Sequence, residues 1–143
     1  MKSNELRIGN FVDLGSRIAK VIDIGHQSCT VADLEETQDT MEDYERTKGI
    51  ILTDEWFIKF GFYKDGEYWS RGIVDYNYCF RYRDWAKNWA FYQEYTDSVN
   101  PKDDGIKYPI SFDIEYVHQL QNIWYSLLHE EITDNKNLIW FYL

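Results

Sequence analysis

The segment from Phe112 to Ile132 constrains the fold most, because it carries the longest clean helical period in the chain. Apolar residues recur there at steps of three and four, which is the period of one buried helix face. We expect Asp113 to cap this helix and Glu115 to lie in its first turn, where the helix dipole favours negative charge. The apolar face is expected to pack across the antiparallel meander predicted for residues 62–95.

The first 52 residues indicate short strands rather than helices. Turn signals at Gly9-Asn10, Gly15-Ser16 and Gly25 to Ser28 separate short apolar runs. Such closely spaced strands predict an SH3-like small β-barrel or curled sheet over residues 1–52. Further on, Met41 and Tyr44 lie within an acidic stretch, which indicates a loop followed by a strand that returns to this sheet.

Residues 53–143 are expected to form a second subdomain that begins with a short helix. Thr53 is a good N-cap, and Gly61 is a typical residue just beyond a helix end. The helix would present one aromatic face to the core, made by Trp56, Phe57 and Phe60.

An antiparallel meander is predicted after this helix, from Phe62 to Tyr95. Asp65-Gly66 is a hairpin signal, and residues 76–83 alternate aromatic with polar side chains, so the two kinds lie on opposite faces of a strand. A turn near Ala86 to Asn88 would return the chain as a further strand, with a helix as the alternative. Asp97 to Pro109 is expected to be a loop, and Lys136 to Leu143 a terminal strand. The fold class is therefore α+β, with subdomains 1–52 and 53–143.

The acidic composition directs attention to basic partners. The chain of 143 residues has a formal net charge of −10, which disfavours wrapping of duplex DNA, because phosphate contacts need clustered Lys and Arg. A run of carboxylates without any Lys or Arg is the candidate partner-binding patch: Asp33, Glu35, Glu36, Asp39, Glu42, Asp43 and Glu45.

An alternative binding face combines cations with exposed rings. Aromatic residues make up 18% of the chain, and several are interleaved with Arg in the meander. Rings beside Arg can stack the bases of single-stranded RNA or DNA. The residues of this alternative face are Arg71, Arg81, Arg83, Lys87, Trp69, Trp85 and Trp89.

Motifs for catalysis, cofactors and metals are missing from the sequence. His118 and His129 would lie roughly 16 Å apart along one helix, too far to share a metal ion. Cys29 follows His26 closely, but a pair so near in sequence is more often incidental, and Cys29 and Cys79 are expected to be buried thiols. We therefore expect no cofactor, no metal and no enzyme activity. No apolar run approaches a membrane span, and we expect a cytoplasmic protein.

Three motifs resemble an uncharacterised family of small proteins that is common in Bacteroidota phages, prophages and mobile elements. They are Glu5 to Val12 (ELRIGNFV), Leu52 to Phe62 (LTDEWFIKFGF) and Tyr116 to Asn122 (YVHQLQN). The resemblance implies a phage or mobile-element accessory protein in a bacterial cytoplasm and supplies no catalytic residues.

This context leads to an expected function. We expect an acidic binding protein that inhibits a host nucleic-acid-handling defence system, in the manner of an anti-CRISPR protein. Its partner would be a host protein, such as a CRISPR effector or another basic nucleic-acid-binding protein, and RNA would be reached through that partner. The alternative is an accessory module that binds RNA or single-stranded DNA itself.

Overall fold

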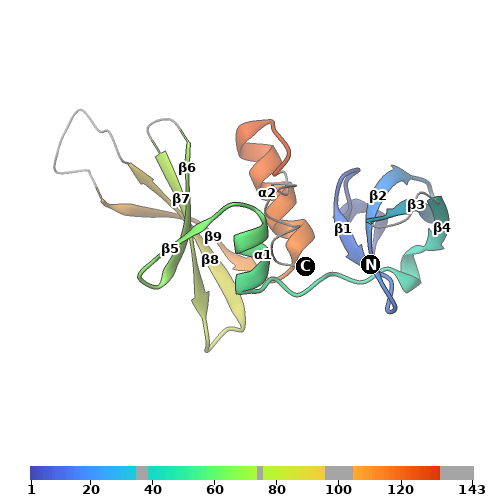
Figure 1. Ribbon diagram of the computed structural model, residues 1–143, viewed down its shortest axis with the longest axis horizontal. Helices are drawn as coiled ribbons and strands as arrows, with labels where there is room; N and C mark the ends of the chain where they lie inside the picture. The colour runs from blue at the N-terminus through green and yellow to red at the C-terminus, as the bar shows by residue number, and fades with distance from the viewer. Residues whose placement is uncertain (35–38, 74–75, 96–104, 133–143) are drawn as a thin grey trace. The chain divides into compact units, whose positions relative to one another are not determined.

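The computed structural model describes residues 1–34, 39–73, 76–95 and 105–132 (Figure 1). In these residues two antiparallel sheets and two α-helices are formed, which confirms the α+β class. The chain divides into two compact units. One combines Met1–Leu52 with Tyr116–Ile132, and the other contains Thr53–Glu115.

The first unit contains a four-stranded sheet in the order β1-β2-β3-β4. Alternate residues of its inner strands, among them Val21 and Val31, point to one side and are fully buried. Tyr44 completes this core from the 3-10 helix η2. The elements are η1 (Ser3–Glu5), β1 (Phe11–Asp13), β2 (Ile18–Ile24), β3 (Ser28–Asp33), β4 (Asp39–Asp43) and η2 (Tyr44–Arg46).

The first unit contains the expected sheet of short antiparallel strands, but it is not a closed barrel. After η2 the chain returns beside β1, where Asp13 and Lys48 exchange two backbone hydrogen bonds of 2.9 Å each. This is an isolated bridge rather than a fifth strand. The predicted strand within the acidic stretch is confirmed as β4, which pairs with β3.

The long helix α2 (Val117–Leu128) begins later than its apolar period indicated. Asp113 does not cap it, because residues 107–114 pair with a neighbouring strand of the second sheet up to Ile114. The helix start is held instead by Gln119, whose Oε1 accepts a hydrogen bond from the Tyr116 backbone N–H at 3.0 Å. It ends at His129, which has the left-handed φ of 55°.

Hydrogen bonds tie α2 to the first unit. Gln121 is 1% exposed; its Oε1 accepts from the Phe11 N–H at 2.9 Å, and its Nε2 donates to the Gly9 carbonyl at 3.0 Å. The Val117 N–H donates to the carbonyl of Ile50 at 2.9 Å. The expected division at residue 52 had placed this helix with the meander, whereas these bonds group it with the N-terminal sheet.

The second unit is a five-stranded meander in the order β5-β6-β7-β8-β9, with one helix on it. The predicted short helix and the two predicted hairpins, at Asp65-Gly66 and at residues 86–88, are confirmed. The elements are α1 (Asp54–Lys59), β5 (Tyr63–Asp65), β6 (Tyr68–Ile73), β7 (Tyr76–Arg83), β8 (Asn88–Tyr95) and β9 (Lys107–Ile114).

The core of the second unit is aromatic and centres on Phe57 of α1. This ring is fully buried and lies 4.7 to 5.9 Å, between ring centroids, from four other rings. The four are Phe62, Trp69, Phe80 and Trp89. The predicted aromatic face of α1 is therefore core, and it covers one face of the sheet.

Part of the predicted loop Asp97 to Pro109 is wrong. Residues 107–109 are the first residues of β9, where Pro109 pairs with Tyr92. The proline is tolerated because β9 is an outer strand, so its missing N–H removes no hydrogen bond inside the sheet. Residues 96–104 lie outside the described residues, and so does the predicted terminal strand Lys136 to Leu143.

Candidate functional site

The acidic stretch lies along an edge strand of the first sheet. β4 ends the strand order, and its alternation puts Asp39, Met41 and Asp43 on one side, all three exposed. Met41 is 74% exposed, so its side chain is available for contact on this side of the strand. We call these three residues the acidic edge.

The described members of the predicted acidic patch do not all lie on the acidic edge. Arg17 lies between Asp33 and Glu42, with its Nε 2.5 Å from Asp33 Oδ1 and its Nη2 3.8 Å from Glu42 Oε1. Two of the carboxylates are thus engaged within the sheet. Glu45 is exposed in η2, and Glu35 and Glu36 lie outside the described residues.

The predicted Arg and aromatic face is divided between two faces of the second sheet. Trp69 and Trp89 are buried against Phe57, and Trp69 Nε1 donates to Asp54 Oδ1 at 2.8 Å. Arg71 donates to the Phe60 carbonyl at 2.9 Å, beside the same helix. These three predicted residues therefore belong to the helix-covered face and its core.

Arg81 and Arg83 lie on the opposite face, together with rings that the sequence did not single out. Tyr68 is the pairing partner of Arg81 in β6, and Tyr92 is the pairing partner of Cys79 in β8. Alternation along β7 predicted the Arg face correctly. The rings on it come from neighbouring strands, and only the strand register shows that they share this face.

Rings and cations form a continuous succession across this open face. Arg83 lies over the rings of Trp85 and Phe112, at 4.8 and 5.2 Å from Cζ to the centroid. Phe112 contacts Tyr92 at 6.2 Å, Tyr92 contacts Tyr68 at 5.8 Å, and Lys107 Nζ lies 4.7 Å from the Tyr68 ring. We call Trp85, Arg83, Phe112, Tyr92, Tyr68 and Lys107 the ring–cation row.

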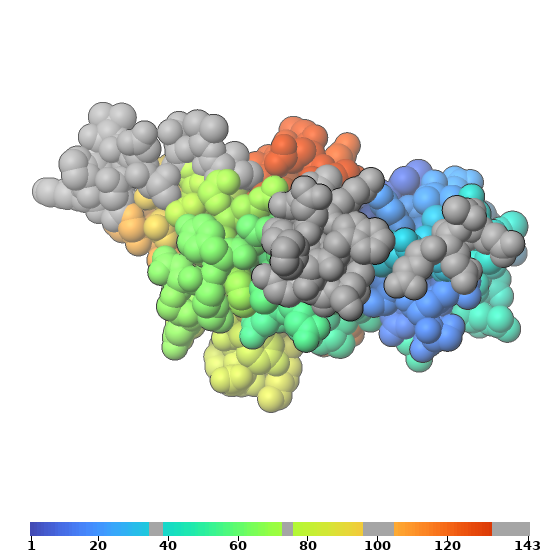
Figure 2. Space-filling view, in the orientation of Figure 1, coloured from blue at the N-terminus to red at the C-terminus, as the bar shows by residue number. Residues whose placement is uncertain are grey.

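Trp85 lies at the turn of the β7–β8 hairpin, the yellow projection in Figure 2. Its side chain is 82% exposed, the largest value among the exposed large hydrophobic residues. Lys87 is in the same turn, is also exposed, and has a positive φ of 56°. The turn therefore presents an aromatic side chain and a cation to solvent.

The cations of this face differ in how their charge is compensated. Lys107 Nζ is 2.9 Å from Glu94 Oε2, which raises the pKa of Lys107, and Arg81 is 3.0 Å from Glu67 Oε2. Arg83 instead donates to the neutral Asn88 Oδ1, from Nε at 2.9 Å and Nη2 at 2.6 Å, and to the Phe112 carbonyl. Among the described residues Arg83 has no carboxylate partner.

The two cysteines are free and buried, as predicted. Burial raises the pKa of the Cys79 thiol to about 11, and nearby Glu94 adds to this shift. Burial also raises the pKa of Cys29, while His26 is exposed on its turn. Since the thiolate is the nucleophilic form, neither cysteine is activated for catalysis.

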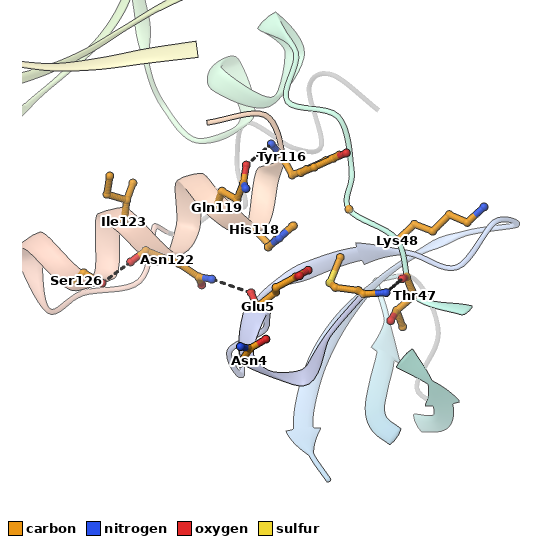
Figure 3. A pocket seen from close by; sticks show the side chains of 12 residues that line it. Asn4, Glu5, Thr47, Lys48, Tyr116, His118, Gln119, Asn122, Ile123 and Ser126 are labelled. Carbon is orange, nitrogen blue, oxygen red and sulfur yellow. Dashed lines mark hydrogen bonds between the residues drawn. The ribbon is translucent and has the colours of Figure 1, made fainter. Parts of the chain in front are cut away.

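A pocket of about 840 Å³ lies in the first unit, beside the start of α2 (Figure 3). It is lined by polar side chains such as Asn4, Glu5 and Asn122, and by the buried His118. The His118 ring stacks on Tyr116 at 5.7 Å, and burial lowers the pKa of His118. In the described residues its Nδ1 has no hydrogen-bond partner.

The pocket's polar side chains are largely used to hold the chain together. Asn122 Nδ2 donates to the Glu5 carbonyl at 3.1 Å, its Oδ1 accepts from Asn10 at 2.8 Å, and Ser126 donates to the Asn122 carbonyl. Figure 3 shows the Asn122 and Ser126 bonds along the pocket wall. This explains in part why the motif Tyr116 to Asn122 is rich in amides: it docks the helix.

The described residues lack the side-chain clusters and long apolar helices that other classes of site need. No group of three or more His, Cys, Asp and Glu side chains there could hold a metal ion. None of the helices in those residues has the length and apolar character needed to cross a membrane. Comparison of the chain with protein-family models, curated proteins and solved structures found no match.

Proposed function

We propose that this protein acts by protein–protein contact and that its acidic edge binds a basic partner. The observation that carries the proposal is the position of β4 at the edge of the described sheet, where Met41 stands exposed between Asp39 and Asp43. The activity we propose is inhibition of a host nucleic-acid-handling defence system, with a CRISPR effector as the leading candidate partner.

The geometry of β4 supports strand addition. An edge strand offers unpaired backbone N–H and C=O groups, and an extended segment of a partner can pair with them. Carboxylates on the edge deter most strands, but they favour one that carries Lys or Arg at the facing positions. Met41 supplies an adaptable apolar contact between the two charges.

The shape of the first unit adds to this proposal. Its short strands, the η2 turn and the Asp13–Lys48 bridge are the parts from which an SH3-like barrel is built, and we propose this finer relationship for residues 1–52. Small β-barrels of that kind often bind peptides, although fold alone does not assign function. The resemblance of three motifs to phage and mobile-element proteins supplies the anti-defence context.

A charge-reversal experiment tests the proposal. The double variant Asp39→Lys, Asp43→Lys is compared with the control Asp65→Lys, Asp113→Lys, which changes the charge equally at exposed strand positions of the other sheet. Each tagged protein is used to retain partners from a Bacteroidota lysate, and the retained protein is then purified and assayed for nuclease activity with each variant.

We expect the unmodified protein and the control to retain a basic nucleic-acid-handling protein and to inhibit it. The edge variant should neither retain nor inhibit that protein. Retention should fall as salt is added, because exposed charges are screened. Equal retention by both double variants, or a retained protein whose activity is unaffected, would show the proposal to be wrong.

A further inference from the structure

The ring–cation row has two properties that a protein core does not need. Its end, Trp85, is almost fully exposed, and Phe112 next along the row is 41% exposed. The helix of this unit lies on the other face, so these rings are not part of the Phe57 core. Exposed aromatic rings such as those of Trp85 and Phe112 are groups on which unpaired bases stack. Tyr68 and Tyr92, by contrast, are half-buried.

Arg83 provides the charge that distinguishes one ligand class from others. It carries a full positive charge between two exposed rings, and its described partners are an amide oxygen and a carbonyl oxygen. Those bonds hold the guanidinium in place before any ligand arrives. In a chain of net charge −10, a fixed cation without a carboxylate partner favours an anionic ligand.

From these contacts we propose that the ring–cation row binds single-stranded nucleic acid. Trp85 and Phe112 are the stacking rings, Arg83 contacts phosphate, and Lys87 adds a second cation at the hairpin turn. Tyr92 and Tyr68 continue the path toward Lys107; their rings meet at 81°, so they present edges and hydroxyl groups rather than a flat platform. This site is independent of the acidic edge and uses other residues.

Other ligand classes fit the same residues less well. Duplex DNA hides its base faces and needs many phosphate contacts, whereas Arg81 and Lys107 are already paired with carboxylates. A basic protein would be repelled by Arg83. A neutral glycan could use the rings but would leave the charge of Arg83 without a counterpart.

Binding is measured by fluorescence anisotropy with labelled single strands of about twelve nucleotides, a length within the site sizes of single-strand binders. Oligo(dT) and oligo(U) are used in parallel, so that the result also separates DNA from RNA. The variants are Trp85→Ala and Arg83→Gln. The control is Tyr82→Ala. Tyr82 is an exposed aromatic residue like Trp85, at 41%, but it lies on the other face of β7, beside Trp89.

We expect the unmodified protein to bind single strands in a salt-dependent manner. Trp85→Ala should weaken binding by about 5- to 150-fold, the range for loss of one stacked base. Arg83→Gln should reduce the slope of log affinity against log salt by about 0.7, the value per phosphate contact for single strands, and Arg83→Lys should restore it. Tyr82→Ala should bind as the unmodified protein does.

Several results would overturn the proposal. It is contradicted if the unmodified protein does not bind at low salt, if Trp85→Ala binds with unchanged affinity, or if Tyr82→Ala loses as much affinity as Trp85→Ala. Equal competition by an unlabelled duplex of the same length would show general anion binding instead. Circular dichroism melting of each variant confirms that the fold is intact, which is expected because the Trp85 side chain is 82% exposed.

Discussion

At the scale of single residues, His118 is a titratable side chain buried in the first unit. His118 is 3% exposed and is stacked on Tyr116, so its charged form would have to give up hydration inside the protein. Burial therefore lowers its pKa, while the charge of Glu5 opposes the shift and the N-terminal amine adds to it. The neutral imidazole is the form that the fold accommodates.

This burial predicts a pH dependence of stability. Because the folded pKa of His118 lies below its unfolded value of about 6.5, the unfolded chain binds more protons below that pH. The free energy of unfolding should therefore fall as pH decreases through 6.5, by at most about 1.4 kcal/mol per pH unit from this residue. Above pH 7.5 the contribution should be constant.

Urea unfolding at several pH values measures this effect. The variant His118→Gln should remove that part of the slope, whereas His26→Gln should leave it in place, since His26 is exposed. An unchanged slope in His118→Gln would show that other groups cause the pH dependence.

At the scale of elements, periodicity predicts which face of a helix is buried but not what covers it. The apolar stripe predicted for α2 is confirmed for Val117, Leu120 and Trp124, which are completely buried. Leu127, nearer the end of the helix, is 41% exposed. That this helix packs on the first unit was not predicted. Its hydrogen bonds to that unit come from amides more than a hundred residues away, at Asn10 and at the Phe11 backbone. Similarly, the period of two in β7 predicted its faces, while the strand register decided which rings lie beside Arg83.

Gln121 provides a test of how α2 is docked. The nearly isosteric variant Gln121→Leu removes both side-chain bonds and leaves the Phe11 N–H and the Gly9 carbonyl without them in a buried place. We expect a loss of about 2–5 kcal/mol in the free energy of unfolding, because each buried polar group left unsatisfied costs about 1–3 kcal/mol.

Urea denaturation measures this loss, and Gln27→Leu is the control, since Gln27 is exposed in a turn. A loss below about 0.5 kcal/mol, the usual size for a surface substitution, would mean that the helix is docked chiefly by its apolar face.

At the scale of the whole molecule, residues Thr53–Glu115 of the second unit lie in the chain between two segments of the first, Met1–Leu52 and Tyr116–Ile132. Ile51 and Tyr116 form an antiparallel bridge, so the chain leaves and re-enters the first unit at neighbouring points. The chain leaves the first unit after Leu52 and returns to it at Tyr116. The sequence contained no sign of the second junction near residue 116, because the strand β9 and the helix α2 follow one another almost directly.

This connectivity predicts that the first unit can be built without the second. Residues 1–52 joined to 116–132 by an Asn-Gly turn should fold cooperatively, because that turn closes antiparallel strands at the spacing of the Ile51–Tyr116 bridge. Residues 1–52 alone should not fold, since Gly9 and Phe11 lose the Gln121 bonds. Circular dichroism melting and dispersed amide NMR signals check both chains; an unfolded joined chain would show that the units depend on each other.

The sequence by itself determined the class of most elements: strands before residue 44, a short aromatic helix after Thr53, a meander with hairpins at residues 65–66 and 86–88, and a late amphipathic helix. These follow from local rules of period, capping and turn chemistry, which act over a few residues. Tertiary structure alone decided that α2 belongs to the first unit, that Trp69 and Trp89 are core, and that Phe112 joins Arg83. The physical reason is that strand register and amide pairing depend on groups far apart in the chain, whose meeting no local pattern encodes.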